Sequence, residues 1–492
     1  MRNRHFKKFA IILGPLLFVL TLLFFHPEGL SNEANAVLAT TLWVAVWWIF
    51  EAVPISVTAL LPIILFPLSG GMDLSSTTAS FGHKYVFLYI GGFILAVAIE
   101  KWNLHKRIAL SIINVIGTSV SKIILGFMVA TAFLSMWISN TATAVMMLPI
   151  GMAIITQLKD NPDTVEDENA IFGKALMLAI AYSASIGGVA TLIGTPPNLV
   201  FAGILEEQFG IEMTFSKWIV FGFPISLLLL FICWKYLTSF AFTFQQKDFP
   251  GGKAEIKRQL SLLGKISYEE KAVLVVFVLT AFLWITRSFL LKQFVPAIDD
   301  TIIAMASATV LFIIPTKDKK SVLIDWESAV KLPWGILLLF GGGLALAEGF
   351  KSSGLASWIA TQVTLIEGLP LIVLLLVVVF MVNFLTEITS NLATTAMLLP
   401  IIVPVALSLD IHPFILMVGI TVAASCAFML PVATPPNAIV FGSGYLRIPD
   451  MIKTGIWMNI ISIILITLIT YFLLPVLWDF DMSSFPEALK IN

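Results

Sequence analysis

The sequence SNTATAVMMLPI at residues 139–150 recurs in closely similar form as SNLATTAMLLPI at residues 390–401. In each copy a short polar Ser-Asn segment interrupts sequence that otherwise resembles an apolar helix. Such an interruption leaves backbone groups without intrahelical partners where water is scarce, which is costly unless something binds there. Duplicated, interrupted helices with small polar residues are typical of secondary transporters whose site lies between two structural repeats. The two segments therefore predict a transporter of this kind.

Each interrupted segment is followed by a matching Thr-Pro-Pro-Asn motif. The first copy is Gly194-Thr195-Pro196-Pro197-Asn198, and the second is Ala433-Thr434-Pro435-Pro436-Asn437. Two consecutive prolines remove two N–H donors and prevent a continuous helix. We expect the break to free carbonyl oxygens at or near Gly194 and Ala433.

The composition indicates a protein that is solvated by lipid. Of the 492 residues, 58% are hydrophobic and only 12% are charged, and the mean hydropathy is +0.97, so polar residues are too few to cover a water-soluble body. The formal net charge of −1 argues against a nucleic-acid partner, because a phosphate-binding surface needs a basic excess. Cys233 and Cys426 lie in apolar stretches without a metal-binding spacing, and we expect both to be buried.

The predicted fold is an all-α polytopic membrane protein with about 11 transmembrane helices and two re-entrant helical hairpins in an inverted repeat. A span needs roughly 20 apolar residues. The first apolar run follows basic residues as in a signal peptide, but no small-residue cleavage site precedes His26, so we expect a retained helix. The predicted spans are 9–26, 36–50, 52–68, 85–100, 170–206, 216–242, 270–290, 300–315, 334–350, 412–444 and 456–477.

Two further apolar stretches, 119–157 and 368–407, are each divided by a Ser-Asn segment. Each could form two ordinary crossings, but the limbs are short, and a hairpin that enters and leaves on the same side fits better. The predicted organisation is an N-terminal cytoplasmic segment with the first helix at 1–34, a first repeat at 35–242 with hairpin 119–157 and broken helix 170–206, a cytoplasmic linker at 243–269, and a second repeat at 270–492 with hairpin 368–407 and broken helix 412–444.

Basic residues predict the orientation. With a cytoplasmic N-terminus, three basic segments fall inside, as the positive-inside rule requires. The two halves are then inverted, so that the first hairpin opens from the cytoplasm and the second from outside. The basic residues are Lys101, Lys106, Arg107, Lys247, Lys253, Lys257, Arg258, Lys265, Lys317, Lys319 and Lys320.

The hairpin tips offer groups for ions of both signs. Their hydroxyls and amides, with the N–H groups and positive dipole ends of helix N-termini, suit an anion. No Lys or Arg lies near either tip, so an anion would be held by dipoles, polar side chains and bound cations. The uncharged oxygens suit a hard monovalent cation, and Na⁺ is the natural candidate. Alternatively these polar residues only hold helices together, although a packing role rarely needs the same break twice.

Glu387 lies three residues before Ser390, inside an apolar stretch. Burying a charge in a membrane is costly and usually purposeful. The carboxylate is either a proton site or a structural acceptor that ties the second hairpin together, and we favour the structural role.

The tips, the Thr-Pro-Pro breaks, the inverted repeat and the length resemble the divalent anion:sodium symporter family of INDY-type dicarboxylate transporters, most closely its bacterial branch from Gram-positive organisms. The resemblance implies a homodimer in the cytoplasmic membrane, with a static scaffold and a transport domain that moves like an elevator. The implied cargo is a C4 or C5 dicarboxylate such as succinate, malate, fumarate or 2-oxoglutarate, carried with Na⁺.

The resemblance also implies the site residues. The first cation site would comprise Ser135, Ser139, Asn140 and Gly194, and the second Thr386, Thr389, Asn391 and Ala433. The implied substrate-binding residues are Ser139, Asn140, Thr141, Ser390, Asn391, Leu392, Thr195, Thr434 and Pro435.

One departure from the family pattern affects the second tip. Many relatives carry Ser-Asn-Thr at both tips, but the second tip here reads Ser-Asn-Leu, so the hydroxyl at Leu392 is absent and substrate preference is open. Some family members exchange dicarboxylates without Na⁺, and we favour symport over exchange. An anion channel would need a continuous polar pore. An enzyme would need His, Cys or paired acids at the tips, and the sequence places none there.

Overall fold

The computed structural model describes residues 2–117, 119–157, 168–244, 250–362 and 368–486, and the regular elements within them are helices, accompanied by isolated β-bridge residues such as the pair Pro315 and Val322. Eight described helices are long and apolar enough to cross a membrane, and six shorter apolar helices of 10–17 residues accompany them. The predicted all-α polytopic membrane fold is therefore confirmed.

The first half of the chain runs from the N-terminal helix to the end of the first broken helix and the span that follows it. Its helices are α1 (Arg2–Phe24), α2 (Asn32–Ile49), α3 (Ile55–Thr58), α4 (Leu61–Ser69), α5 (Leu74–Ala79), η1 (Ser80–Gly82), α6 (Lys84–Lys101), α7 (Leu104–Ile116), α8 (Val120–Ser135), α9 (Asn140–Ile155), α10 (Glu168–Val189), α11 (Pro196–Phe209), α12 (Phe215–Tyr236) and the π-helix η2 (Leu237–Ala241).

The second half repeats this order of a hairpin followed by a broken helix. Its helices are α13 (Pro250–Leu262), α14 (Tyr268–Thr286), the π-helix η3 (Arg287–Leu291), α15 (Lys292–Phe294), α16 (Asp300–Ile313), α17 (Trp326–Ala329), α18 (Trp334–Ser352), α19 (Leu355–Gln362), α20 (Leu371–Leu385), α21 (Asn391–Ser408), α22 (Pro413–Ala424), α23 (Pro435–Phe441), α24 (Ile448–Phe472) and α25 (Leu474–Trp478).

Two stretches differ in detail from the simplest expectation. The apolar stretch 52–68 is one region, but it is divided into α3 and α4, because Pro62 lies in the first turn of α4, where a missing N–H is tolerated and a new helix begins readily. The stretch 243–269, predicted as the linker between the halves, contains α13, and its residues 245–249 lie outside the described part of the chain. Within α13 Arg258 pairs with Glu255 at 2.6 Å, an i,i+3 contact that supports an exposed helix.

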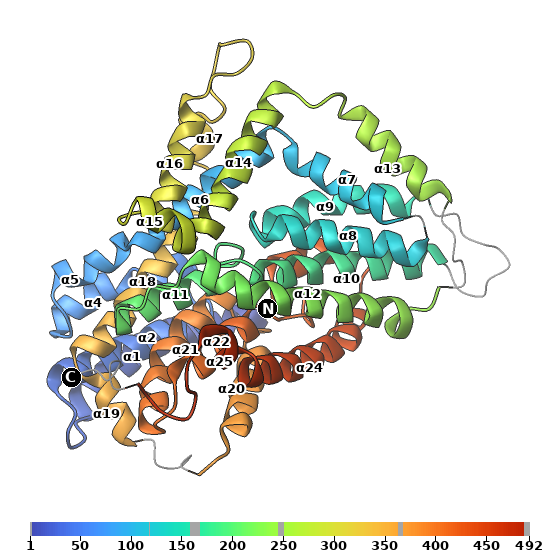
Figure 1. The fold of residues 1–492 in the computed structure, drawn as a ribbon. Coiled ribbons are helices and arrows are strands. Elements are labelled where there is room, and N and C mark those ends of the chain that lie inside the picture. Colours follow the sequence, from blue (N-terminus) through green and yellow to red (C-terminus); the bar gives the residue numbers. More distant parts are fainter. Residues whose placement is uncertain (1, 118, 158–167, 245–249, 363–367, 487–492) are drawn as a thin grey trace.

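The hairpins are held by the broken helices of both halves. Helices α8 and α9 pack against α10, and α20 and α21 pack against α22. The second part of each broken helix packs against the hairpin of the other half: α11 packs against α21, and α23 packs against α9. Figure 1 shows α14, α16 and α6 grouped at one end of the molecule, with α7 and α13 passing over the first hairpin. Each broken helix therefore packs against both hairpins.

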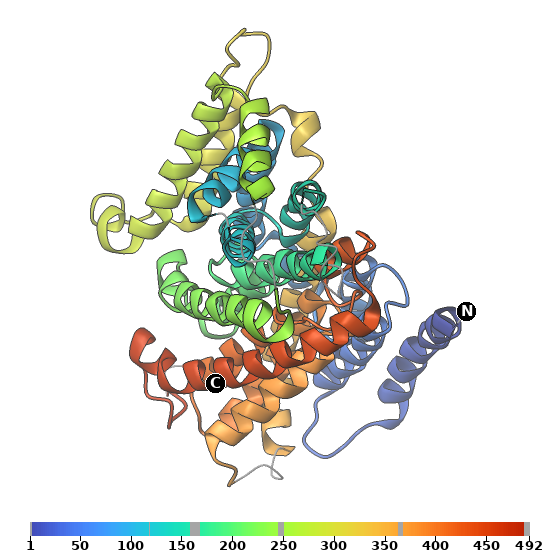
Figure 2. The ribbon, with the colours of Figure 1, turned by 90° about the vertical axis from the view of Figure 1, so that its right-hand side faces the viewer.

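The N-terminal helix lies at the edge of the molecule. Helix α1 packs mainly against α2, and Figure 2 shows it at the outer side of the molecule. Several of its apolar side chains are exposed, among them Phe9 and Leu23 at 59% and 63%. In a chain that spans a membrane, this surface faces lipid and needs no protein partner.

Candidate functional site

The first hairpin turns at the Ser-Asn segment. Helix α8 ends at Ser135 and α9 begins at Asn140, with Ser139 as its N-cap. The Ser139 hydroxyl accepts a hydrogen bond from the backbone N–H of Ala142 at 3.2 Å, which satisfies one of the free donors of the first turn. Ser139 and Asn140 are both partly exposed, so the tip has a stable backbone and remains accessible to a small solute.

Ser135, Asn140 and Gly194 come together beside α10. The Ser135 hydroxyl donates to the carbonyl of Ala184 at 2.6 Å. With its amide nitrogen turned toward these oxygens, Asn140 donates to Ser135 Oγ, Ala184 O and Gly194 O at 2.6, 3.1 and 3.2 Å. One hydroxyl, one amide and two backbone carbonyls thus converge at the point where α10 is broken.

Gly188 closes this cluster, and the sequence analysis did not identify it. A Cβ atom at Gly188 would lie 2.6 Å from the side-chain amide group of Asn140 and 3.0 Å from the carbonyl oxygen of Gly194. Any larger residue would therefore displace the two groups that form the cluster. The pair Gly187-Gly188 near the end of α10 is the signal that could have indicated a close approach at this position.

The second hairpin repeats the arrangement. Helix α20 ends at Leu385 and α21 begins at Asn391. The Thr386 hydroxyl donates to the carbonyl of Ala424 at 2.9 Å and lies 2.7 Å from the Asn391 amide oxygen. This hydroxyl, amide and carbonyl correspond to Ser135, Asn140 and Ala184 in the first half. The sequence repeat therefore brings the same three kinds of group together twice, although Asn140 presents its amide nitrogen to the hydroxyl and Asn391 presents its amide oxygen.

The other predicted members of the second cation site, Thr389 and Ala433, are both buried. Thr389 forms hydrogen bonds with the carbonyl of Leu385 at 2.9 Å and with the hydroxyl of Thr394 at 2.6 Å, which tie it to its own hairpin. Ala433 is 5% exposed and directly precedes Thr434, the N-cap of α23. The cluster around Thr386 and Asn391 is thus the better-defined part of the predicted site.

Both helix breaks are bridged by an asparagine amide. In the first, Asn198 donates to the carbonyls of Gly188, Val189 and Thr191 at 3.3, 3.3 and 2.8 Å. In the second, the amide of Asn437 donates to the carbonyls of Ala427 and Leu430 at 3.3 and 3.0 Å. These carbonyls lie at or beyond the ends of α10 and α22, where the helix supplies no donor, and the asparagine amides satisfy them. The Asn of each Thr-Pro-Pro-Asn motif therefore stabilises the break.

The predicted substrate-binding residues differ in exposure. Thr141 and Pro435 are exposed, and Ser390 and Asn391 are partly exposed. Thr195 and Thr434 cap α11 and α23 and are buried. Leu392 is 5% exposed and belongs to the hydrophobic core. The two tips therefore differ at the third position of the motif: an exposed threonine in the first and a buried leucine in the second.

Glu387 binds the backbone of the second helix break, between α22 and α23, through hydrogen bonds. Its Oε1 accepts hydrogen bonds from the backbone N–H groups of Phe428 and Met429 at 2.7 and 2.9 Å and from the Asn459 amide at 2.8 Å. Its Oε2 accepts from the backbone N–H of Leu430 at 3.0 Å. A carboxylate that accepts four hydrogen bonds is fixed as an acceptor, as the favoured structural role requires. No pattern in the sequence indicated Asn459 as a partner of Glu387.

We expect Glu387→Gln to destabilise the protein strongly. Glutamine keeps the shape but turns one oxygen into an NH₂ group, which then faces a backbone N–H or the Asn459 amide. Each hydrogen bond to a charged group contributes about 1.5–3 kcal/mol, so the variant should melt at a clearly lower temperature in detergent. Glu33→Gln, at an exposed position of α2, is the matched control. An unchanged melting temperature together with an altered pH profile of activity would instead indicate a proton site.

The comparison with protein families decides the class of this molecule. The profile described as the sodium:sulfate symporter transmembrane region matches residues 3–478. The chain belongs to this family. Membership in this symporter family identifies a membrane transporter and not an enzyme, and it confirms the resemblance found in the sequence.

Several relatives within the family are closely similar over their whole length. The sodium-dependent dicarboxylate transporter SdcS of Staphylococcus saprophyticus is 51% identical over 487 residues, which cover 98% of this chain and 94% of that protein. The protein of the same name from Staphylococcus aureus (strain bovine RF122) is 50% identical with the same coverage.

Two solved structures share the fold. The efflux pump MtrF of Neisseria gonorrhoeae superposes with a TM-score of 0.58 and 13% identity, covering 91% of this chain and 96% of that one. The YdaH transporter of Alcanivorax borkumensis gives a TM-score of 0.56 and 12% identity, covering 89% and 98%. At this level of identity the likeness shows the fold alone.

Proposed function

We propose that the chain is a secondary active transporter that moves C4 or C5 dicarboxylates across the cytoplasmic membrane together with Na⁺. One observation carries the proposal: a hydroxyl, an amide and a backbone carbonyl of the following broken helix meet at Ser135–Asn140 and again at Thr386–Asn391. Uncharged oxygens at a helix break suit Na⁺. Relatives named sodium-dependent dicarboxylate transporters, about half identical to this chain, support the choice of ion and cargo.

The proposed cation sites use the residues expected from the sequence. The clusters supply hydroxyl and amide groups from the hairpins and carbonyls from the broken helices. The first site comprises Ser135, Ser139, Asn140 and Gly194, and the second comprises Thr386, Thr389, Asn391 and Ala433.

The proposed substrate site lies between the hairpin tips. The N-termini of α9, α11, α21 and α23 all begin at the motifs, so free N–H groups and positive dipole ends face this region. A dianion would be held by these groups and by the bound Na⁺. The substrate-binding residues are Ser139, Asn140, Thr141, Ser390, Asn391, Leu392, Thr195, Thr434 and Pro435.

The transport cycle follows from the inverted halves. We place the N-terminus in the cytoplasm, repeats at 35–242 and 270–492, and the first hairpin open to the inside. The hairpins and broken helices would move as one body against a static scaffold in each subunit of a homodimer. An elevator motion of this kind carries the whole site across the membrane while both breaks stay bonded.

Counterflow in proteoliposomes tests the class of mechanism. Internal unlabelled succinate should drive labelled succinate to accumulate transiently above its equilibrium level, and uptake should saturate. A channel gives no such overshoot, because it does not couple the movement of one molecule to that of another. Recovery of the label as succinate would also exclude an enzyme, and absence of any overshoot with a folded protein would refute the proposed function.

A further inference from the structure

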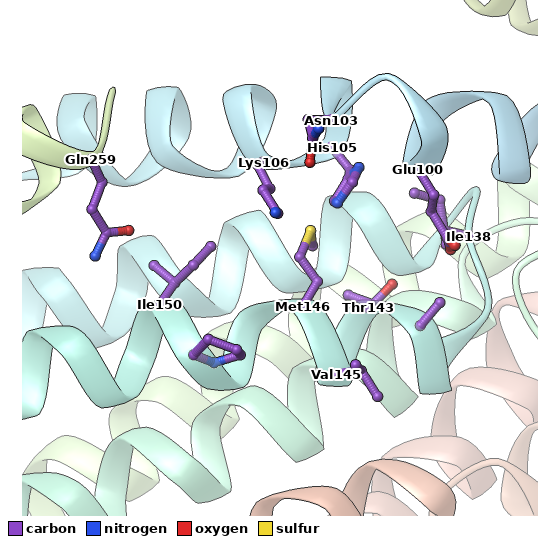
Figure 3. Close-up of a pocket in the computed structure, with 12 residues that line it drawn as sticks. Glu100, Asn103, His105, Lys106, Ile138, Thr143, Val145, Met146, Ile150 and Gln259 are labelled. Carbon is purple, nitrogen blue, oxygen red and sulfur yellow. The ribbon is translucent and has the colours of Figure 1, made fainter. Parts of the chain in front are cut away.

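A pocket of about 610 Å³ lies between the first hairpin and the helices that pass over it. This volume is within the range of roughly 300–1,000 Å³ that is usual for small-molecule sites. Figure 3 shows α9 on one side of the pocket, with residues of α6, α7 and α13 on the other. The lining residues are Glu100, Asn103, His105, Lys106, Ile138, Ala142, Thr143, Val145, Met146, Pro149, Ile150 and Gln259.

The pocket follows α9 from the hairpin tip outward. Ile138 and Ala142 flank the Ser-Asn-Thr motif, and Ile150 lies two turns further along the helix. At about 1.5 Å per residue, Ala142 and Ile150 are roughly 12 Å apart along the axis. Figure 3 places Gln259 at one end of the pocket and Ile138 with Glu100 at the other. The pocket therefore extends from the tip of the first hairpin to its base. It lies beside α6, α7 and α13, which carry basic residues predicted to be cytoplasmic.

One buried hydroxyl in the pocket lining has no hydrogen-bond partner among the described residues. Thr143 lines the pocket and is fully buried, and its hydroxyl oxygen has no hydrogen-bond partner among the described residues. Buried hydroxyls are nearly always bonded to protein or water. Thr143 lies one turn after the Ser139 cap, so this unpartnered hydroxyl is a polar group on the hairpin side of the pocket.

Among the described residues, Lys106 is the one basic side chain of its segment for which no salt bridge is found. Its neighbours Lys101 and Arg107 pair with Asp325 and Glu270 at 2.6 and 2.8 Å. Lys106 takes part in no ion pair within the described chain, and Figure 3 shows its amine directed into the pocket. An unpaired amine on the wall of a hollow is available to an anionic solute.

The other polar groups of the pocket do not compete for this role. The Nδ1 of His105 lies 2.9 Å from the carbonyl of Ile99, so Nδ1 carries the proton. Burial lowers the pKa of His105, which keeps the ring neutral near pH 7. Glu100, the only acidic side chain among the described residues that line the pocket, lies at its tip end and suits a cation that leaves the site. Lys106 is thus the lining residue that supplies a positive charge to the pocket.

We propose that this pocket is the cytoplasmic vestibule of the transport site, and that Lys106 binds one carboxylate of the dicarboxylate as it passes between the hairpin tip and the cytoplasm. The inference rests on the proposed function and adds a positioning residue to it. Lys106 would act only on the inner side, because the vestibule follows the limb of the hairpin that opens inward.

The first test compares the two faces of the membrane in vesicles of known orientation. Lys106→Gln should raise the apparent KM for cytoplasmic succinate about threefold to tenfold, since a nearby charge raises local substrate concentration and capture rate. The KM for external succinate should not change. Lys253→Gln, which removes an exposed lysine of α13 that does not line the pocket, should change neither value. Equal KM values for Lys106→Gln and wild type on the cytoplasmic side would overturn the proposal.

The second test does not depend on transport. Met146→Cys places a thiol on the pocket wall, and both natural cysteines are buried. An anionic thiosulfonate reagent should modify it faster than a cationic one, and adding Lys106→Gln should lower this ratio about threefold to tenfold, while Lys253→Gln should not. If the ratio of the two modification rates is unchanged while dicarboxylate uptake is normal, the vestibule proposal is wrong and the proposed function still stands. A wild type that takes up no dicarboxylate overturns the proposed function and the carboxylate assignment with it.

Discussion

Asn140→Asp and Asn391→Asp should each reduce dicarboxylate transport at least a hundredfold. Aspartate keeps the size of asparagine but places a negative charge beside the bound dianion, and like charges in a partly desolvated site cost several kcal/mol. A hundredfold loss corresponds to about 2.7 kcal/mol, well within that cost. At Asn140 the substitution also turns an amide that donates to Ala184 O and Gly194 O into an oxygen that repels them.

The measurement is the initial rate of labelled succinate uptake by equal amounts of protein in proteoliposomes. Asn32→Asp, at an exposed first residue of α2, introduces the same charge far from the tips and should leave the rate near that of the wild type. A single symmetrical peak in size-exclusion chromatography shows that each variant is folded. Near wild-type rates in both tip variants would rule out the site assignment.

The start of each inner hairpin helix could be predicted from local chemistry. Ser139 and Ser390 precede Asn140 and Asn391, and α9 and α21 begin at those asparagines. Serine is a preferred N-cap, and a polar pair inside an apolar run leaves few other places to begin a helix. The proline pairs fixed the starts of α11 and α23 in the same way.

The partners of these residues could not be predicted, because they come from other elements. Ala184 and Ala424 contribute only carbonyl oxygens, which no residue type reveals. Asn459 reaches Glu387 from a helix that is far away in the sequence. Such contacts depend on how helices pack, and a local pattern contains no information about packing.

Hydropathy conceals some local features of the chain. The stretch 52–68 is apolar throughout, yet it is divided into α3 and α4, with Pro62 in the first turn of α4. The burial of Leu392 was equally hidden in the sequence: Leu392 is 5% exposed and packs in the core, while its counterpart Thr141 is exposed. A leucine in the Ser-Asn motif indicates that the two tips differ. The direction of its side chain, however, is set by the packing of α21.

Uptake of labelled succinate or malate into proteoliposomes, compared between an inward Na⁺ gradient and choline, tests the central claim most directly. We predict that uptake needs the Na⁺ gradient, because both oxygen clusters must be filled before a dianion can be held without a basic side chain. If more than two Na⁺ accompany each dianion, uptake should also respond to voltage, by about 2.3 kcal/mol per 100 mV for each net charge moved. Equal uptake in choline and Na⁺, strongly accelerated by internal dicarboxylate, would contradict the account and identify an exchanger.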